Sequence, residues 1–349
     1  MYMYNSILCT CLHILFFSEF SADEFVENLF NEGRKTNCDE TSGSFKNNLV
    51  VPPFYDEELF KMGQQFFYRN IFNIFLNKFL GLMALLSVPS PIVDILILTN
   101  KSSTTVTAYK RYMETIFYMR LWYDDSFRPG TKSWESLIKV RKMHNSASKM
   151  GNLRLNHRIK QFDMTVTLFG FMGFAVARTK MMGIHHYTER ELKGFIHLWR
   201  CIGYVLGIED RFNICRESVK ETKEICSLII EKLFRPAMQN SSKHFETLSK
   251  ALVSGMWAMN PFLEHEVFSL YLHMVVENSN DPTRQPAFKN LSLGAKTRLY
   301  VILYTVWSLQ FSIVKTLHNY LQLFALWAMA HFPFLAYIQF GTKKGRVSI

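Results

Sequence analysis

Apolar side chains recur every three or four residues from about Asp56 onward, with polar side chains between them. This spacing places the apolar residues on one face of an α-helix. The pattern predicts helices over 56–86, 91–99, 104–123, 134–149, 161–176, 216–234 and 242–258. A capping box, Thr188-Glu-Arg-Glu191, predicts a further helix that begins at about residue 189. No segment alternates with period two over a useful length, so the pattern indicates an all-α fold.

The pattern changes near the C-terminus, where residues 319–340 contain no Asp, Glu, Lys or Arg. At 1.5 Å per residue, such a helix is long enough to cross a bilayer core of roughly 30 Å. The basic residues at 343–346 are typical of a cytoplasmic flank. Residues 299–314 are also apolar. Two interpretations stay open: a membrane-spanning helix, or a pair of helices that pack on the core or lie in the membrane interface.

The other end of the chain is apolar as well. Residues 1–17 are apolar but short and have no basic leader, so they are consistent with a weak signal-anchor or with a mis-assigned start. We therefore divide the chain into an N-terminal apolar stretch and tether (1–55), a large helical domain (56–298), apolar C-terminal helices with expected membrane association (299–341) and a basic tail (342–349).

The composition supports a large helical core. Hydrophobic residues make up 48% and aromatic residues 15%, whereas Gly and Pro number only 16 and 10, which argues against a β-sandwich or barrel. The net charge of +11 does not indicate nucleic-acid binding, because Lys and Arg are spread along the chain without an RNA-binding or zinc-finger signature. A basic surface near a membrane explains the charge equally well. The six cysteines lack zinc-binding spacing, and we expect Cys201 and Cys215 to be buried thiols.

The usual catalytic signatures, from the P-loop to the zinc-protease motif, are absent, so single residues must be weighed. His144 shares the apolar face of the predicted helix 134–149 with Leu137 and Val140. A neutral imidazole in such a position is a good axial ligand for iron, although spacing alone favours a core histidine.

Arg111 and Thr115 are four residues apart and share one face of the predicted helix 104–123. A guanidinium group that points into an apolar pocket needs an anion or a hydrogen-bond acceptor, such as a haem propionate. A salt bridge at the helix surface is the alternative.

Other polar residues favour structural roles. A buried Asp163 needs a partner, for which an Arg of the helix 134–149 is a candidate. The pair His185-His186 has no third ligand nearby in the sequence, so we expect a solvated loop there.

Several of these segments occur together in an order that resembles one family. They are Lys110-Arg-Tyr-Met-Glu-Thr115, Lys139-Val-Arg-Lys-Met-His144, Gln161-Phe-Asp-Met-Thr-Val-Thr167, Met182-Gly-Ile184, Thr188-Glu-Arg-Glu-Leu192 and His197-Leu-Trp-Arg-Cys-Ile-Gly-Tyr-Val-Leu-Gly-Ile-Glu209. Over roughly residues 56–260 the chain resembles the endoplasmic-reticulum-bound oxygenases of the mycophenolic acid pathway and the bacterial rubber oxygenases. The Val-Arg-x-x-His and Trp-Arg-x-x-Gly-x-x-Leu-Gly-Ile patterns together are the most specific part of this resemblance.

The resemblance implies an all-helical fold with a globin-like core that binds haem b and uses dioxygen to cleave double bonds of isoprenoid chains. It implies that His144 is the proximal haem ligand and hence the iron ligand. It also implies that Arg111 and Thr115 are the Arg and Thr of the haem-side helix, where they would contact the cofactor and serve as catalytic residues. The helical domain is then an oxygenase-like haem-binding domain.

The sequence departs from this family at three places. Glu114 stands where rubber oxygenases have a Lys just before the matched Thr, and Ser148-Lys149 stands where an Arg is expected after the His. The carboxylate base has no secure match, and Asp94 is the nearest candidate.

The leading hypothesis is a haem-dependent oxygenase that acts with dioxygen on a hydrophobic, isoprenoid-type substrate. It would be membrane-associated, with the endoplasmic reticulum as a candidate location, and it would bind no nucleic acid. The alternative is a non-catalytic haem- or lipid-binding membrane-associated protein of the same fold, which the departure at Glu114 favours. A structural membrane protein without a cofactor is the third possibility.

Overall fold

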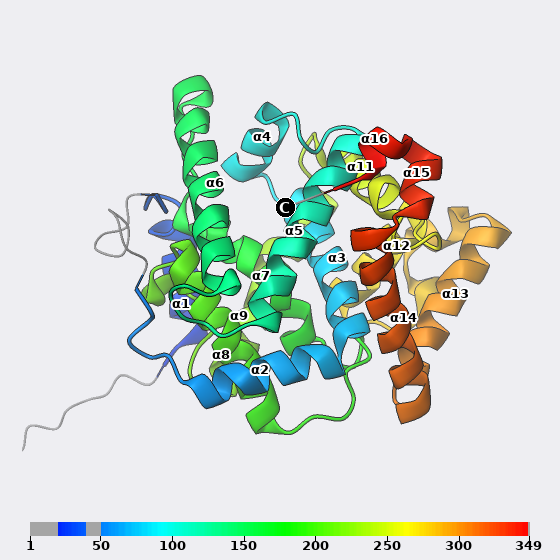
Figure 1. Ribbon diagram of the computed structural model, residues 1–349. Helices are drawn as coiled ribbons and strands as arrows, with labels where there is room; N and C mark the ends of the chain where they lie inside the picture. The colour runs from blue at the N-terminus through cyan, green and yellow to red at the C-terminus, as the bar shows by residue number, and fades with distance from the viewer. Residues whose placement is uncertain (1–19, 40–49, 348–349) are drawn as a thin grey trace, which may run out of the picture.

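The computed structural model describes residues 20–39 and 50–347, which fold into α-helices joined mostly by short loops (Figure 1). The first helices are α1 (Ala22–Asn31), α2 (Glu57–Arg69), α3 (Ile71–Ser87), α4 (Pro91–Leu98), α5 (Thr105–Asp124), α6 (Lys132–Leu155), α7 (Gln161–Ala177) and α8 (Glu189–Leu206). They are followed by α9 (Val219–Ile229), α10 (Arg235–Gln239), α11 (Phe245–Met256), α12 (His265–Glu277), α13 (Leu293–Ser308), α14 (Ser312–His331), α15 (Phe334–Phe340) and α16 (Thr342–Gly345). No strand occurs in this part of the chain, which confirms the predicted all-α fold.

The predicted helix 56–86 is divided in two at Asn70. Helices α2 and α3 meet there at a bend of 90°. The Asn70 side-chain amide donates to the Phe66 carbonyl at 2.9 Å and so satisfies a group at the end of α2. The prediction of one continuous helix was wrong because a side chain that bonds the backbone in this way competes with helix continuation.

Helices α3 and α7 form the centre of the molecule. Twelve of the 17 residues of α3 and 14 of the 17 residues of α7 are buried. Their backbones touch at Gly81 and Gly170, where a Cβ atom on Gly81 would lie 2.2 Å from the Gly170 carbonyl oxygen. Asn77 also joins them, since its amide donates to the Phe171 carbonyl and accepts from the Ala175 N–H, both at 2.7 Å.

The C-terminal helices cover one side of the molecule, away from α1 and α6 (Figure 1). Within the described residues, no single helix is long and apolar enough to cross a membrane. The predicted apolar segment 319–340 is shared between α14 and α15, which Phe332 and Pro333 separate. Helices α13 and α14 meet the length and composition criterion only as a pair, and that pair bends by 116°. The predicted apolar stretch 1–17 lies outside the described residues.

The end of the described chain returns to α5. The Tyr109 hydroxyl donates to the Gly345 carbonyl at 2.6 Å, and the Tyr109 ring stacks on Phe340 at 4.9 Å between ring centres. These two contacts attach α15 and α16 to the helix that bears Arg111 and Thr115.

Candidate functional site

Helices α5 and α6 form an antiparallel pair joined by residues 125–131. The Trp122 indole N–H donates to Ser136 Oγ at 2.7 Å. One turn further along α5, the Tyr118 ring lies 5.1 Å from Lys139 Nζ. The two contacts show that a step of one turn towards the N-terminus of α5 corresponds to a step of one turn towards the C-terminus of α6.

Continued by one turn, this register places Thr115 close to the level of His144, and Arg111 follows one turn further along α5. The positive charge of Arg111 acts directly on the His144 imidazole. The structure therefore places Arg111 near His144, and it places Thr115 one turn from Arg111 on α5.

His144 differs from a core histidine whose two ring nitrogens are both paired. Burial, together with the charges of Arg111 and Arg141, lowers its pKa from 6.5 to about 4, so the imidazole is neutral at physiological pH. Its Nδ1 atom is buried and has no hydrogen-bond partner among the described residues. Since buried polar atoms are nearly always paired, this atom calls for an explanation. A neutral imidazole with an unused ring nitrogen fits an axial haem ligand.

Arg111 and Thr115 retain capacity for a further partner. The Arg111 guanidinium donates to Thr99 Oγ1 over a long 3.3 Å, and burial lowers its pKa. The Thr115 hydroxyl donates to the Arg111 carbonyl at 3.0 Å, which leaves its oxygen lone pairs available. A half-buried guanidinium with most of its N–H groups uncommitted suits a carboxylate such as a haem propionate.

Arg141 supports this site, and sequence reasoning did not single it out. Only 4% of Arg141 is exposed, and its Nη1 atom donates to the Val205 carbonyl at 2.8 Å. It lies against Gly207, which ends α8 with φ 110°, and a Cβ atom on Gly207 would be 2.6 Å from Nη1. This contact explains why the Val-Arg-x-x-His and Leu-Gly-Ile segments occur together: Arg141 of the first segment packs against the end of α8, where the second segment lies. The motif itself was the available signal.

Lys78 is a second residue that the sequence did not reveal. Its Nζ atom contacts the Met119 sulfur and lies 5.1–5.9 Å from the centres of five aromatic rings. The rings belong to Phe67, Phe75, Tyr123, Phe171 and Trp199. Burial holds the pKa of Lys78 well below 10.5. Met119 is one turn from Thr115 on α5, so this amine adjoins the helix face of the site.

Asp163 is structural. Its carboxylate accepts from the Lys160 N–H at 2.8 Å and from the Ser90 hydroxyl, and burial raises its pKa. The expectation of an Arg partner from α6 was wrong, because the backbone at the start of α7 provides the bond instead.

The remaining sequence candidates lie elsewhere. Asp94 is 42% exposed at its side chain and lies 3.9 Å from both His157 and His244, at the surface rather than in the buried site. His186 is exposed and its Nε2 atom is 3.0 Å from the Gln310 carbonyl oxygen. His185 is half-buried, and burial lowers its pKa. Cys201 and Cys215 are buried free thiols, as predicted.

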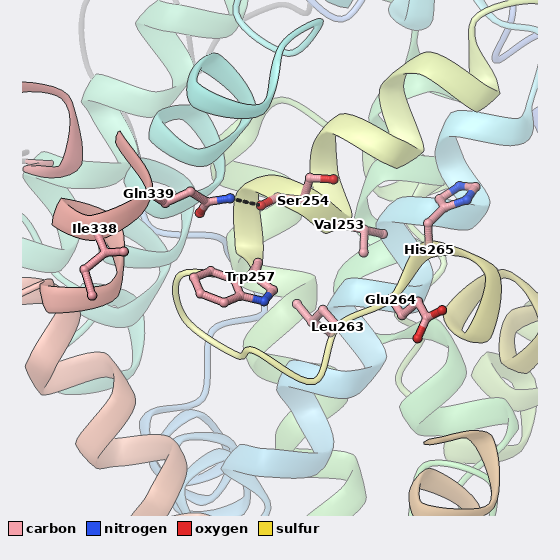
Figure 2. A pocket seen from close by; sticks show the side chains of 8 residues that line it. All are labelled: Val253, Ser254, Trp257, Leu263, Glu264, His265, Ile338 and Gln339. Atoms are coloured by element: carbon pink, nitrogen blue, oxygen red, sulfur yellow. Dashed lines mark hydrogen bonds between the residues drawn. The ribbon is translucent and has the colours of Figure 1, made fainter. Parts of the chain in front are cut away.

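A cleft of about 490 Å³ is lined by residues other than those of this site. It lies between α11, the start of α12 and α15 (Figure 2). Gln339 of α15 donates to the Ser254 carbonyl across it at 3.1 Å. Trp257 and Ile338 contribute apolar walls, and His144 is not among its lining residues.

The donor set fits haem better than a bare metal ion. No group of three or more His, Cys, Asp or Glu side chains that could hold an ion occurs among residues 20–39 and 50–347. A single neutral histidine beside an arginine, between helices rich in apolar side chains, is how proteins bind haem iron and its propionates.

The described residues thus form an all-helical protein with a candidate site around His144, and comparison with protein families assigns its class. Residues 79–276 match the family described as the ER-bound oxygenase mpaB/B'/rubber oxygenase catalytic domain. The chain therefore belongs to this oxygenase family.

A solved structure gives the same result for the fold. The structure of latex clearing protein LCP in the closed state aligns with a TM-score of 0.51 and 17% sequence identity, over 87% of this chain and 86% of that one. No curated protein matches the chain.

Proposed function

We propose that this protein is a haem-dependent oxygenase that acts with dioxygen on a hydrophobic, isoprenoid-type substrate at a membrane, with the endoplasmic reticulum as the candidate location. The observation that carries the haem part is His144: a partly buried, neutral imidazole whose buried Nδ1 atom has no partner among the described residues, next to Arg111. Membership of the oxygenase family supports the reaction class.

Each residue of the site has a role in this proposal. His144 would bind the iron, which supplies the redox centre for dioxygen chemistry. Arg111 would pair with a propionate, since its guanidinium is half-buried and bonded only weakly to Thr99. The Thr115 hydroxyl, held by the Arg111 carbonyl, would present its lone pairs to a hydrogen-bond donor in the site. Arg141 positions His144 by fixing α6 against the end of α8.

The alternative, a haem- or lipid-binding protein without turnover, is favoured by two observations. Glu114 stands where rubber oxygenases have a Lys, and it lies on α5 next to Thr115. Asp94, the nearest candidate for a base, is at the surface. Dioxygen consumption by haem-loaded protein with an isoprenoid lipid separates the two functions.

The first test is the visible spectrum of the full chain with haem added in detergent. We expect a Soret band from bound haem that is lost or shifted in His144→Ala and in His144→Gln, while the exposed-loop variant His186→Ala keeps it. Far-UV circular dichroism identifies any variant that fails to fold. A folded wild-type protein that binds no haem would refute the proposed cofactor.

A further inference from the structure

The exposed large apolar side chains of the protein are concentrated in its C-terminal helices. Of the 20 that are described, 15 lie between Leu293 and Ile338: 13 on α13, α14 and α15, and two, Phe311 and Phe332, in the links between these helices. We call the exposed apolar side chains of residues 293–338 the C-terminal apolar face. Exposed contiguous patches of this kind mark sites of association in soluble proteins.

The exposed apolar residues of this face are additional to the apolar residues by which the same helices pack on the protein core. On α14, the outward residues Leu317, Phe324 and Trp327 are 57%, 63% and 52% exposed, while Leu326 and Met329 of the same helix are buried. The outward residues follow helical spacing, so they form a continuous stripe. A helix that is apolar on both sides requires a second apolar environment besides the protein core.

The residue types and their packing match a lipid interface. Tyr304 and Trp307 on α13 have ring centres 5.6 Å apart, and Phe324 and Trp327 on α14 have ring centres 5.9 Å apart. All four side chains are more than half exposed. Tyr and Trp are favoured at the boundary between acyl chains and headgroups because their rings are apolar and their N–H or O–H groups are polar.

The charge of this region favours an anionic lipid surface over a second copy of the chain as the partner of the C-terminal apolar face. After Asp281 the sequence contains eight Lys and Arg residues and no Asp or Glu. Lys343, Lys344 and Arg346 are exposed directly after α15. Arg284 and Arg298 are paired with Asp281 and Glu264, which precede this face in the sequence. A second copy packed on this face would bring the other cations, Lys343, Lys344 and Arg346 among them, against one another, whereas anionic lipid headgroups would neutralise them.

The arrangement of the helices suits contact along a surface. Residues 309–311 separate α13 from α14, the chain bends by 116° between them, and both helices lie on one side of the molecule (Figure 1). Exposed aromatic stripes run along both helices. Interfacial helices bind membranes in this way, with the axis in the plane of the bilayer and one stripe among the acyl chains.

We infer that the C-terminal apolar face lies in the interface of one leaflet of an anionic lipid bilayer, with α13 and α14 along the membrane surface and the basic residues 343–346 at the headgroups. This inference deepens the membrane part of the proposed function and is independent of haem. The same face would place the helical domain on the membrane that contains a hydrophobic substrate.

Vesicle flotation of the full-length protein tests this inference. We expect the wild type to float with phosphatidylcholine vesicles that contain about one-third phosphatidylserine, and much less with phosphatidylcholine alone. The double variant Phe324→Ser/Trp327→Ser should bind at least about tenfold more weakly, because two exposed aromatic side chains are lost from the interface. The matched control is Val50→Ser/Leu153→Ser, which removes two exposed apolar residues elsewhere and should bind as the wild type does.

Two further measurements separate the alternatives. Brominated lipids should quench Trp fluorescence most strongly when the bromine is near the headgroup end of the acyl chain, whereas strongest quenching by bromine at the bilayer centre would contradict the in-plane arrangement. Absence of flotation, equal loss in the Val50→Ser/Leu153→Ser control, or a dimer by light scattering that Phe324→Ser/Trp327→Ser dissociates would overturn the inference. The Soret band recorded on the same samples shows separately whether the haem proposal stands.

Discussion

Lys78 and the lowered pKa of His144 show, at the scale of single residues, what the sequence could not reveal about the site. His144, Arg111 and Thr115 were identified because each lies on the apolar face of a predicted helix within a familiar pattern. The low pKa of His144 depends on burial and on two arginines that lie 33 and 3 positions away in the sequence, so no local pattern encodes it. Lys78 is enclosed by rings from α2, α3, α5, α7 and α8, and only the tertiary fold brings these together.

The buried amine of Lys78 should make stability depend on pH. The pKa of Lys78 is about 10.5 in the unfolded state and is lower in the folded state. At a pH between these two pKa values, the unfolded state binds the proton and the folded state does not. The free energy of unfolding of the wild type should therefore rise with pH, by at most about 1.4 kcal/mol per pH unit from this group. Lys78→Met should be more stable than the wild type at pH 7, and this advantage should shrink towards pH 10.

Urea denaturation of both proteins at the two pH values measures this difference. Lys344→Met, which removes an exposed lysine, is the control and should show no pH-dependent difference from the wild type. A constant difference between Lys78→Met and the wild type would contradict the lowered pKa of the Lys78 amine.

Gly207 gives a second prediction at this scale. It has φ 110°, and a Cβ atom there would also lie 2.6 Å from Arg141 Nη1. Gly130 has φ 86° with nothing within 4 Å, so Gly130→Ala measures the conformational cost alone. We expect Gly207→Ala to lower the free energy of unfolding by about 1–3 kcal/mol more than Gly130→Ala does, because it also displaces the buried guanidinium. Equal effects in thermal denaturation would mean that Arg141 does not depend on this glycine.

At the scale of elements, hydrophobic periodicity predicted most helices but not where they break. The helices at 91–99, 104–123 and 161–176 correspond closely to α4, α5 and α7. The division at Asn70 was missed because the apolar pattern continues across it while an amide side chain ends the backbone ladder. Helix α12 was also missed, since its residues are apolar on nearly all sides and show no clear period.

The contact between α3 and α7 is an element-scale feature with a measurable energy. Gly81→Ala would place a methyl group 2.2 Å from the Gly170 carbonyl, which forces the two central helices apart. We expect a loss of about 1–3 kcal/mol or more in the free energy of unfolding. Gly294→Ala, in the first turn of α13 with open space around it, is the helical control and should be neutral or stabilising by about 0.5–1 kcal/mol. If chemical denaturation gives both variants the same stability, the close approach of α3 and α7 is wrong.

At the scale of the whole molecule, the candidate site and the C-terminal apolar face belong to different parts of the chain. The site lies within the part of the chain that matches the oxygenase family, between residues 79 and 276. The C-terminal apolar face, residues 293–338, lies wholly beyond that match. The oxygenase-family core and the apolar C-terminal surface are thus separate parts of the sequence, which is why the spectrum of bound haem and the flotation of vesicles test them separately.

The bond between Tyr109 and Gly345 links these two parts mechanically. Helix α5 receives the end of the C-terminal helices at Tyr109 and presents Arg111 two residues later. In a membrane-bound molecule, a change in the tilt of the helical domain relative to the bilayer would act on α5 directly, because the C-terminal helices are bonded to α5 itself. Helix α5 would then transmit the lateral pressure of the surrounding lipid from the C-terminal helices to Arg111 and Thr115.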